Sequence, residues 1–488
     1  MVSLSPCRPG RHRCVARAIA CNWRQQGCTI VRAALMMTVL AVVLSGCSTT
    51  APTVAQAPVL PSSYGPGAAR DVPRNAEAWW RQFHDPVLER LVAEARRQNL
   101  SIAEAQARLR AAYAQASTAS ALFLPTVDGS GQAVAANSRK TIDDTLHRPV
   151  MAGLDMSWDV GLFGLAEHSA RAANADASIA QENLEAVRIV VTADVAAAYI
   201  GLRSAQHQTE LTTTRVISLQ RRVRLSRVRT QTGLALPGEE ADGVAALEET
   251  RSELARLQSR VVEHQQQIAT LLGTSAPDPT LLRNGPQPNA KDVPAVGHPA
   301  DLLRARPDVR AAEQRVLRAS AEVGIAQAEL YPRLRLGGTI GIGGPTNGSL
   351  MRLAGGPSLQ IPLFDYGRRK ALFHARRALL DEALAAYRQT VLVAYQQAST
   401  AFAAWRAARA SEARQASAIQ ALRRRDHQMR VLKREGLADA RQFSEADSGW
   451  LDGQQRLVLA RENEALALVA LYKALGAATL QGEARGRR

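Results

Sequence analysis

Apolar and polar residues alternate with a period of two in four short segments of the chain. Small or apolar side chains occupy every second position in segments 126–135 and 150–158, and segments 333–342 and 357–363 repeat the pattern. Such alternation predicts strands with one apolar and one polar face. Each segment is close to the roughly 9–11 residues that a tilted strand needs to cross a bilayer. We therefore predict four membrane strands; the alternative is a soluble hairpin packed on a helix.

Two much longer segments, 165–231 and 367–433, contain no proline, and each is 67 residues long. At 1.5 Å per residue, such a helix measures roughly 100 Å, whereas globular helices average about 11–12 residues. Helices of this length must pack side by side on neighbours. Small residues such as Ala196-Ala197-Ala198 and Ala403-Ala404 allow close approach.

Each long segment ends at a glycine turn and is followed by a shorter helical segment. The turns lie at Gly233 and Gly436, and the returning segments cover 239–272 and 439–475. The first returning segment ends before a stretch rich in proline and glycine, 276–299. Helical segments also precede the strands, at 79–99, 100–123 and 301–330.

The chain thus contains the same order of predicted segments twice. The two turn glycines are 203 residues apart, and short motifs recur at similar offsets. A repeat of this length is a structural half rather than a small solenoid unit. The recurring motifs are Gly233-Leu234-Ala235 with Gly436-Leu437-Ala438, Leu271-Leu272-Gly273 with Ala474-Leu475-Gly476, Leu124-Pro125 with Tyr331-Pro332, and Leu162-Phe163-Gly164 with Leu363-Phe364-Asp365.

The N-terminal region carries a targeting signal. Arg32 precedes an apolar run, 33–44, that is too short to span a bilayer as an ordinary helix and is typical of a signal peptide. The run ends in Leu44-Ser45-Gly46-Cys47, which resembles a bacterial lipobox and predicts a lipid on the Cys47 sulfur. The alternative is a chance cysteine after an ordinary signal sequence. Ser48 after the cysteine, by the same resemblance, favours sorting to the outer membrane.

Charge and cysteine content narrow the function. The formal net charge is +17, and removal of residues 1–46 with their six arginines leaves +11. We expect no nucleic-acid partner, because an exported lipoprotein does not meet nucleic acid and the charges are spread along helices. All five cysteines lie at or before Cys47, so the body of the chain has no disulfide.

Catalytic and cofactor motifs are absent from the sequence. It has no HExxH, CxxC or Walker lysine motif, and the glycine-rich segment 337–344 lacks the Gly-Lys-Ser/Thr ending of a phosphate loop. We therefore expect no enzyme and no cofactor beyond the lipid on Cys47. Four strands cannot close a barrel in lipid, so the chain must oligomerise; a dimer would supply eight strands and a trimer twelve.

Several motifs resemble the TolC-type outer-membrane factors, in their lipoprotein branch that includes OprM- and NodT-like proteins. The resemblance covers about 75–478, and it implies a mainly α fold with a small β part. Long antiparallel helices would form a trimeric periplasmic α-barrel, and four strands per chain would contribute to a 12-stranded outer-membrane β-barrel. The motifs are residues 302–313 with a weaker copy at Asn99-Leu100-Ser101-Ile102, and the segments 328–332, 362–368 and 158–164.

The resemblance also implies a role and partners. It indicates a passive homotrimeric conduit of a tripartite efflux system, anchored in outer-membrane lipid and extending into the periplasm. The partners would be a periplasmic adaptor and an inner-membrane pump of the resistance-nodulation-division type. The alternative function is a lipid-anchored periplasmic coiled-coil protein without a pore, structural or adaptor-like.

Two sets of candidate functional residues follow from the resemblance. In similar proteins a carboxylate nine residues after the turn glycine narrows the entrance, which here gives Glu445 and Asp242, and we add Asp447 and Phe443 as a candidate gate. The alternative is a solvated acid near a helix start. The turns themselves, Gly233 with Leu234 and Gly436 with Leu437, resemble adaptor-docking tips.

These inferences divide the chain into six parts. Residues 1–46 are a signal peptide, with an extension upstream of the true start as an open alternative for the first part. The others are a lipidated proline-rich tether, a first repeat, an equatorial linker, a second repeat and a basic tail, at residues 47–75, 76–275, 276–300, 301–478 and 479–488.

Overall fold

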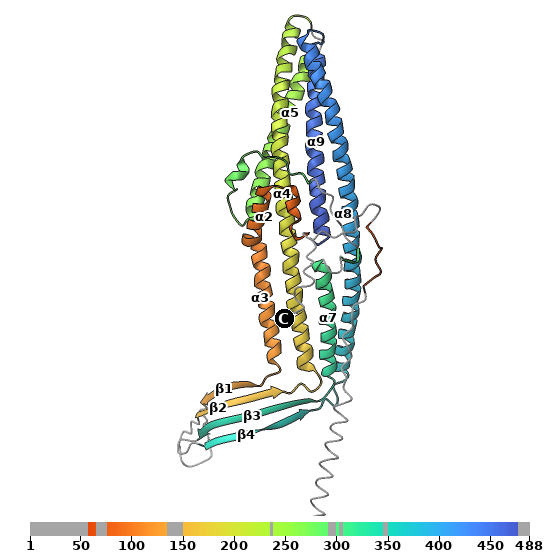
Figure 1. The fold of residues 1–488 in the computed structure, drawn as a ribbon. Helices are drawn as coiled ribbons and strands as arrows, with labels where there is room; N and C mark the ends of the chain where they lie inside the picture. Colours follow the sequence, from red (N-terminus) through yellow and green to blue (C-terminus); the bar gives the residue numbers. More distant parts are fainter. Residues whose placement is uncertain are drawn as a thin grey trace, which may run out of the picture.

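The chain is elongated, with a small sheet at one end and two helical hairpins at the other (Figure 1). The computed structural model describes residues 57–64, 76–133, 150–234, 238–290, 299–301, 306–344 and 350–476. The predicted signal peptide, Cys47 and the basic tail lie outside these residues. Within the described residues, no helix combines the length and apolarity needed to cross a membrane.

Helices make up most of the described chain, and two of them are 67 residues long. The long helices match the predicted proline-free segments to within a residue at each end. The helical elements are η1 (Ala76–Phe83), α2 (Pro86–Gln98), α3 (Leu100–Ala121), α4 (Leu165–Gln231), α5 (Glu239–Leu271), η2 (Pro279–Leu282), η3 (Pro299–Asp301), α7 (Pro307–Ala328), α8 (Arg368–Arg434) and α9 (Ala440–Ala474).

Side-chain caps fix the starts of three helices. Asp85 accepts from two backbone N–H groups at the start of α2, and Asn99 accepts from Ile102 N at the start of α3. Asp439 and Gln442 form a reciprocal capping box at the start of α9. Each cap satisfies N–H groups that have no partner within the helix.

The two halves contain helices of equal length at corresponding positions in the sequence. Helices α3 and α7 are both 22 residues long and start 207 residues apart, and α4 and α8 start 203 residues apart. Gly164 and Gly367, both left-handed, precede the two long helices. Phe163 lies two residues before α4, whereas Phe364 lies four residues before α8. The two phenylalanines, which are 201 residues apart, are therefore not structurally equivalent.

Four antiparallel strands form one sheet in the order β1-β2-β3-β4. They are β1 (Thr126–Ala133), β2 (Val150–Asp159), β3 (Arg333–Gly344) and β4 (Leu350–Gln360). The prediction for the fourth strand was displaced: the strand starts at Leu350 and ends at Gln360, so residues 361–363 lie beyond it. Its first half alternates poorly because small residues, such as Gly355 and Gly356, occupy both faces.

One face of the sheet is apolar and open to solvent in the single chain. Leu154 pairs with Ile340, which pairs with Leu353, and all three side chains are exposed. Asp155 and Thr339 occupy the opposite face at the neighbouring position. This separation confirms the predicted amphipathic pattern and is what a sheet with lipid on one side requires.

The best-packed core lies at mid-height, where α2, α4 and α9 meet. Trp79 is 2% exposed and stacks on Tyr472 with 5.4 Å between ring centroids. Tyr199 donates a hydrogen bond of 2.8 Å to Asp85, and burial is the main cause that raises the pKa of its hydroxyl to about 12. Fixed aromatic contacts of this kind hold the lower and upper helices in one alignment.

Within residues 57–64, the predicted tether contacts the helices at two places. Tyr64 is buried and stacks on Tyr395 of α8, with ring centroids 6.1 Å apart, and Leu60 packs against a second apolar cluster that includes Val309 and Val391. The tether is therefore attached to the side of the helices well before the first 3-10 helix begins.

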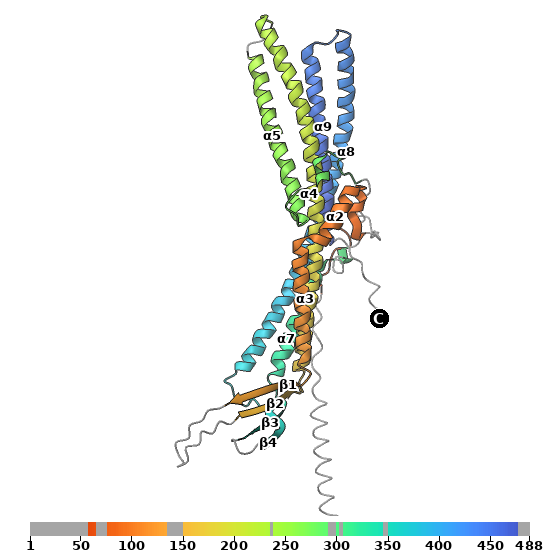
Figure 2. The ribbon, with the colours of Figure 1, turned by 90° about the vertical axis from the view of Figure 1, so that its left-hand side faces the viewer.

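Toward the far end, four helices lie side by side in the order α5, α4, α9, α8 (Figure 2). Helix α4 contacts both α5 and α9, and α9 contacts α8. Helices α5 and α8 are consequently the two edges of this helical layer. Below the middle, α3 and α7 take the places of α5 and α9 beside the long helices.

Candidate functional site

The predicted docking tips lie at the end of the molecule farthest from the sheet (Figure 1). Gly233 and Gly436 have φ angles of 74° and 72° and close the last turns of α4 and α8. Leu234 and Leu437, the residues after them, are 70% and 74% exposed. Two large apolar side chains thus stand unpartnered at the tips of a single chain.

The same backbone geometry builds both turns. Leu234 N donates to Arg229 O at 2.8 Å, and Leu437 N donates to Leu432 O at 2.8 Å. The glycine N–H groups donate to the carbonyls of Thr230 and Lys433. This double pattern is a Schellman motif, which requires a left-handed residue and explains the glycine in each copy.

Of the four candidate gate residues, the structure brings Asp447 and Phe443 together around Arg430. Arg430 donates to Asp447 at 3.0 Å, and its guanidinium lies 5.5 Å from the centre of the Phe443 ring. Lys433 Nζ lies 3.9 Å from the same ring centre. The cluster joins α8 to α9 within about two helical turns of the tip.

Asp426, which the sequence analysis missed, is the second anchor of Arg430. Its side chain is buried, and Arg430 donates to its Oδ2 at 2.7 Å. This hydrogen bond is the main cause that raises the pKa of the Arg430 guanidinium; burial opposes it, and the charges of Asp426 and Asp447 add to it. The signal in the sequence was an Asp at an inward-facing helical position with an Arg four residues later.

Glu445 and Asp242 lie apart from this cluster. Glu445 is exposed and accepts a hydrogen bond of 3.1 Å from Arg441 in its own helix. Asp242 is exposed in the first turn of α5. Both carboxylates therefore face solvent in the single chain, while Asp447 is mostly covered.

Polar ties also cross between the two halves, from α4 to α9. Asp447 accepts a hydrogen bond from Ser218, so the same carboxylate holds α8, α9 and α4 together. Three of these ties, from the tip toward the middle, are Ser218–Asp447 at 2.9 Å, Arg215–Asp452 at 2.6 Å and Ser204–Glu462 at 2.6 Å. The hairpin of α4 and α5 and the hairpin of α8 and α9 diverge toward their tips (Figure 2).

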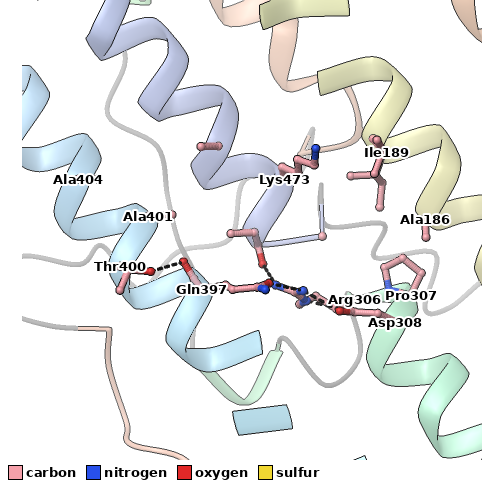
Figure 3. Close-up of a pocket in the computed structure, with 14 residues that line it drawn as sticks. Ala186, Ile189, Arg306, Pro307, Asp308, Gln397, Thr400, Ala401, Ala404 and Lys473 are labelled. Carbon is pink, nitrogen blue, oxygen red and sulfur yellow. Dashed lines mark hydrogen bonds and ion pairs between the residues drawn. The ribbon is translucent and has the colours of Figure 1, made fainter. Parts of the chain in front are cut away.

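Arg306, within the motif at residues 302–313, is buried and lies against residues of α7, α8 and α9 (Figure 3). Arg306 donates to Asp308, to Gln397 of α8 and to the carbonyl of Ala474 at the end of α9. Burial acts to raise the pKa of Asp308, but its hydrogen bonds and charge contact with Arg306 outweigh burial and lower the pKa below its ordinary value. A cavity of about 610 Å³ adjoins this junction.

This junction is structural in character. It ties the start of α7 to two other helices, which explains why the motif has Arg before Pro and Asp after it. Among the described residues, no group of three or more histidines, cysteines and acids is placed to hold a metal ion.

A sheet with one exposed apolar face, joined to 67-residue helices that end in paired turns, is the architecture of an outer-membrane channel subunit. The chain belongs to the outer membrane efflux protein family, whose sequence profile matches residues 91–274 and 299–477. Members of this class lie in the outer membrane and extend into the periplasm, and their fold agrees with the architecture described above.

Individual relatives support this assignment. The toluene efflux pump outer membrane protein TtgC of Pseudomonas putida is 28% identical over 471 residues, which cover 92% of this chain and 96% of that protein. Nodulation protein T of Rhizobium leguminosarum is 28% identical over 385 residues, covering 76% and 78%. The solved structure of the outer-membrane channel OprN is 27% identical, with a TM-score of 0.74 over 86% of this chain and 99% of that one.

Proposed function

We propose that three copies of the chain close into a ring that conducts small molecules passively across the periplasm and outer membrane. Four strands per copy give twelve, a number within the range of natural membrane barrels, whereas a single copy leaves both sheet edges unpaired. The observation that carries the proposal is the combination of open sheet edges with an exposed apolar face. The ring has no catalytic step.

The tips supply the docking surface for a periplasmic adaptor, which connects the ring to an inner-membrane pump of the resistance-nodulation-division type. The exposed Leu234 and Leu437 would insert between apolar side chains of the adaptor. Gly436→Trp tests this role, because its bulk changes the tip alone. We expect a ring of normal size with lost efflux; retained efflux would reject the docking role.

The gate has two parts with different chemistry. Asp447, Phe443 and Arg430 hold the end of the ring narrow through fixed contacts, and Glu445, exposed beside them, lines the entrance. Three Glu445 carboxylates around the ring axis would favour cations. Asp242 occupies the equivalent place in the first half and faces the edge of the helical layer.

The lipid on Cys47 anchors each copy, because acyl chains contribute about 0.8 kcal/mol per buried CH₂ and several on one residue bind stably. Labelling with radioactive palmitate tests the modification. We expect label on the wild-type chain and none on Cys47→Ser, and label on both would place the lipid elsewhere.

Conductance of the purified protein in planar bilayers tests the conduit itself. We expect discrete channels from a complex with the mass of three chains. A monodisperse protein of any size that conducts nothing would favour the alternative, a lipid-anchored coiled-coil protein without a pore. The exposed apolar face of the sheet argues against that alternative, because a coiled-coil protein in the aqueous periplasm would leave this face in contact with water.

A further inference from the structure

A second cavity of about 610 Å³ lies between α4, α7 and α8, in the part of the helical layer that adjoins the sheet (Figure 1). It shares no lining residue with the cavity beside Arg306, and it lies at the opposite end of the helices from the gate cluster. Its volume is within the roughly 300–1,000 Å³ of pockets that hold small organic molecules. Residues of a single chain line it, so the pocket does not depend on the closing of a ring.

Each of the three helices contributes one face to this cavity. The lining residues recur every three or four positions, which is the spacing of side chains along one face of a helix. The lining of α7 lies within 314–327 and that of α8 within 373–380. The lining of α4 covers about 15 Å of helix, so the pocket is elongated along the helices. The α4 residues are His168, Arg171, Asn174, Ala175 and Ser178.

The lining combines apolar surface with basic side chains. Apart from His168, the ionisable lining residues are Arg171 and Arg377, and no acidic residue is among them. Arg171 pairs with Glu167 on its own helix, whereas Arg377 is exposed and makes no ion pair with any described residue. The pocket therefore favours a molecule that joins negative charge to an apolar body. The large apolar lining residues are Leu317, Val323, Phe373 and Leu380.

His168 is the most buried polar residue of the lining. It is 7% exposed, and neither ring nitrogen has a hydrogen-bond partner among the residues that the structure describes. Buried polar groups in proteins are nearly always hydrogen-bonded, and one left without a partner destabilises the fold. The imidazole thus lacks a partner that a molecule in the cavity can supply.

Gly324 of α7 makes room for this imidazole. A Cβ atom at position 324 would lie 2.5 Å from both Cε1 and Nδ1 of His168, which is closer than van der Waals contact allows. The absence of a side chain at Gly324 lets the ring lie directly against the α7 backbone. Glycine in the middle of a helix is less favourable than alanine, so stability alone does not account for this pair.

The other half of the chain has neither residue. By the offsets of the helix starts, the counterpart of His168 is Ala371 and the counterpart of Gly324 is Ser117. The packing of helices in this fold therefore does not require a histidine on a glycine. The pair belongs to this pocket alone, which points to a ligand rather than to architecture.

We propose that this pocket binds an organic anion with an apolar body, whose charged group accepts a hydrogen bond from His168 and faces Arg171 and Arg377. Two sources supply molecules of this chemistry. One is an anionic phospholipid of the bilayer beside the sheet, and the other is a water-soluble anion that passes through the conduit. The second source alone rests on the proposed function.

Binding of an anion also changes the protonation of His168. In the empty pocket, burial first and the charge of Arg171 second lower the pKa of the imidazole, and the charge of Glu167 opposes them. An anionic group beside the ring raises this pKa. Since the complex then binds more protons than the empty pocket, the affinity should rise as the pH falls from about 8 to about 5.5. The other charged group of the lining is Arg377 of α8, and α7 contributes none.

Equilibrium dialysis of naphthoate tests the site, with the full-length lipoprotein in nanodiscs of phosphatidylcholine and empty nanodiscs as the blank. Naphthalenemethanol, which has the same rings and no charge, is the matched neutral ligand. We expect one naphthoate per chain, bound more tightly than the alcohol and more tightly in acid. Equal binding of the two ligands would overturn the proposal.

Substitutions test the assigned contacts. His168→Leu removes the hydrogen bond and should weaken naphthoate binding roughly tenfold or more, and it should abolish the pH dependence. Arg377→Gln should weaken binding about two- to fivefold, because this arginine is exposed. Arg388→Gln is the matched control: it removes the same charge from an exposed position of α8 outside the pocket and should leave the affinity unchanged. Equal effects of the two arginine variants would overturn the proposal even if His168→Leu does not fold.

Native mass spectrometry distinguishes the two sources, with protein reconstituted in equal amounts of phosphatidylglycerol and phosphatidylcholine. Phosphatidylglycerol retained by the wild type and lost from His168→Leu would assign a membrane lipid. Equal retention by both proteins, together with naphthoate binding that depends on His168, would assign a water-soluble anion. If folded His168→Leu alters neither measurement, the proposal is overturned. A wild-type protein that binds naphthoate but conducts nothing in planar bilayers would refute the proposed function and leave this site intact.

Discussion

Substitution of Asp447 by Asn should loosen the proposed gate while leaving its shape intact. The Asp447 side chain is 18% exposed and accepts from Arg430 at 3.0 Å and from Ser218 at 2.9 Å. Asn retains one acceptor oxygen for Arg430, while the contact with Ser218 changes from a hydrogen bond to a charged group into a neutral one. Arg430 keeps its bond of 2.7 Å to Asp426, so no charge is left without a partner.

The size of the effect follows from these contacts. A hydrogen bond to a charged group contributes about 1.5–3 kcal/mol and a neutral one about 0.5–1.5 kcal/mol. We therefore expect the tie from α4 to α9 to weaken by about 1–1.5 kcal/mol, or roughly five- to tenfold in the ratio of closed to open gate. The neighbouring Arg215–Asp452 pair is more than one-third exposed and compensates little.

Single-channel recording measures this ratio directly. Asp447→Asn should raise the fraction of time spent in the larger conductance, and Ser218→Ala should do so less. The double variant should show less than the sum of both effects, because the two residues share one bond. Glu445→Gln is the control: we expect lower cation selectivity with unchanged gating. Additive effects of the first two variants, or an unchanged Asp447→Asn channel, would refute the reasoning.

Three further predictions concern the stability of the fold. Burial, and to a smaller extent the charge of Glu412, raises the pKa of Glu464, so ionisation of this carboxyl group opposes folding. The free energy of unfolding should therefore fall as the pH rises from the ordinary pKa of 4.5 through the raised value. Glu464→Gln should therefore be more heat-stable than wild type at pH 7, and equal to it in acid; an equal difference at both pH values would contradict the assignment. Gly436→Ala places a Cβ in open space but at a φ of 72°, and should cost about 1 kcal/mol, seen as faster proteolysis at the tip; unchanged cleavage would contradict the strain. Leu471→Ala, fully buried between α9 and its neighbours, should cost about 2–5 kcal/mol in chemical denaturation, whereas exposed Leu459→Ala should cost far less.

Much of the fold could be predicted because its elements are long and periodic. The proline-free segments became α4 and α8 with the predicted lengths, since nothing in their sequence interrupts the backbone hydrogen bonds. Strand β4 was displaced because Gly355 and Gly356 give no signal of which face is apolar. Its true extent is set by pairing with β3, which the sequence of β4 alone does not contain.

The candidate gate shows where local sequence stops being informative. Glu445 was chosen from its distance to a turn glycine, and Phe443 and Asp447 were added as its sequence neighbours. Ser218, which donates a hydrogen bond to Asp447, lies 229 residues before it in the chain, and no sequence pattern around either residue indicates the other. The buried Asp426 could have been suspected from its Arg four residues later, but exposed ion pairs have the same spacing throughout the helices.

The docking of Tyr64 on Tyr395 has a consequence for how far the lipid anchor can reach. Tyr64 is the seventeenth residue after Cys47, and a chain of that length spans at most about 60 Å. Tyr395 lies 27 residues into α8 from its sheet-proximal start, a height of about 40 Å above the sheet. A lipid on Cys47, as proposed, would therefore reach the membrane with about 20 Å of extended chain to spare, and it would hold each copy to the bilayer at its waist as well as at its sheet.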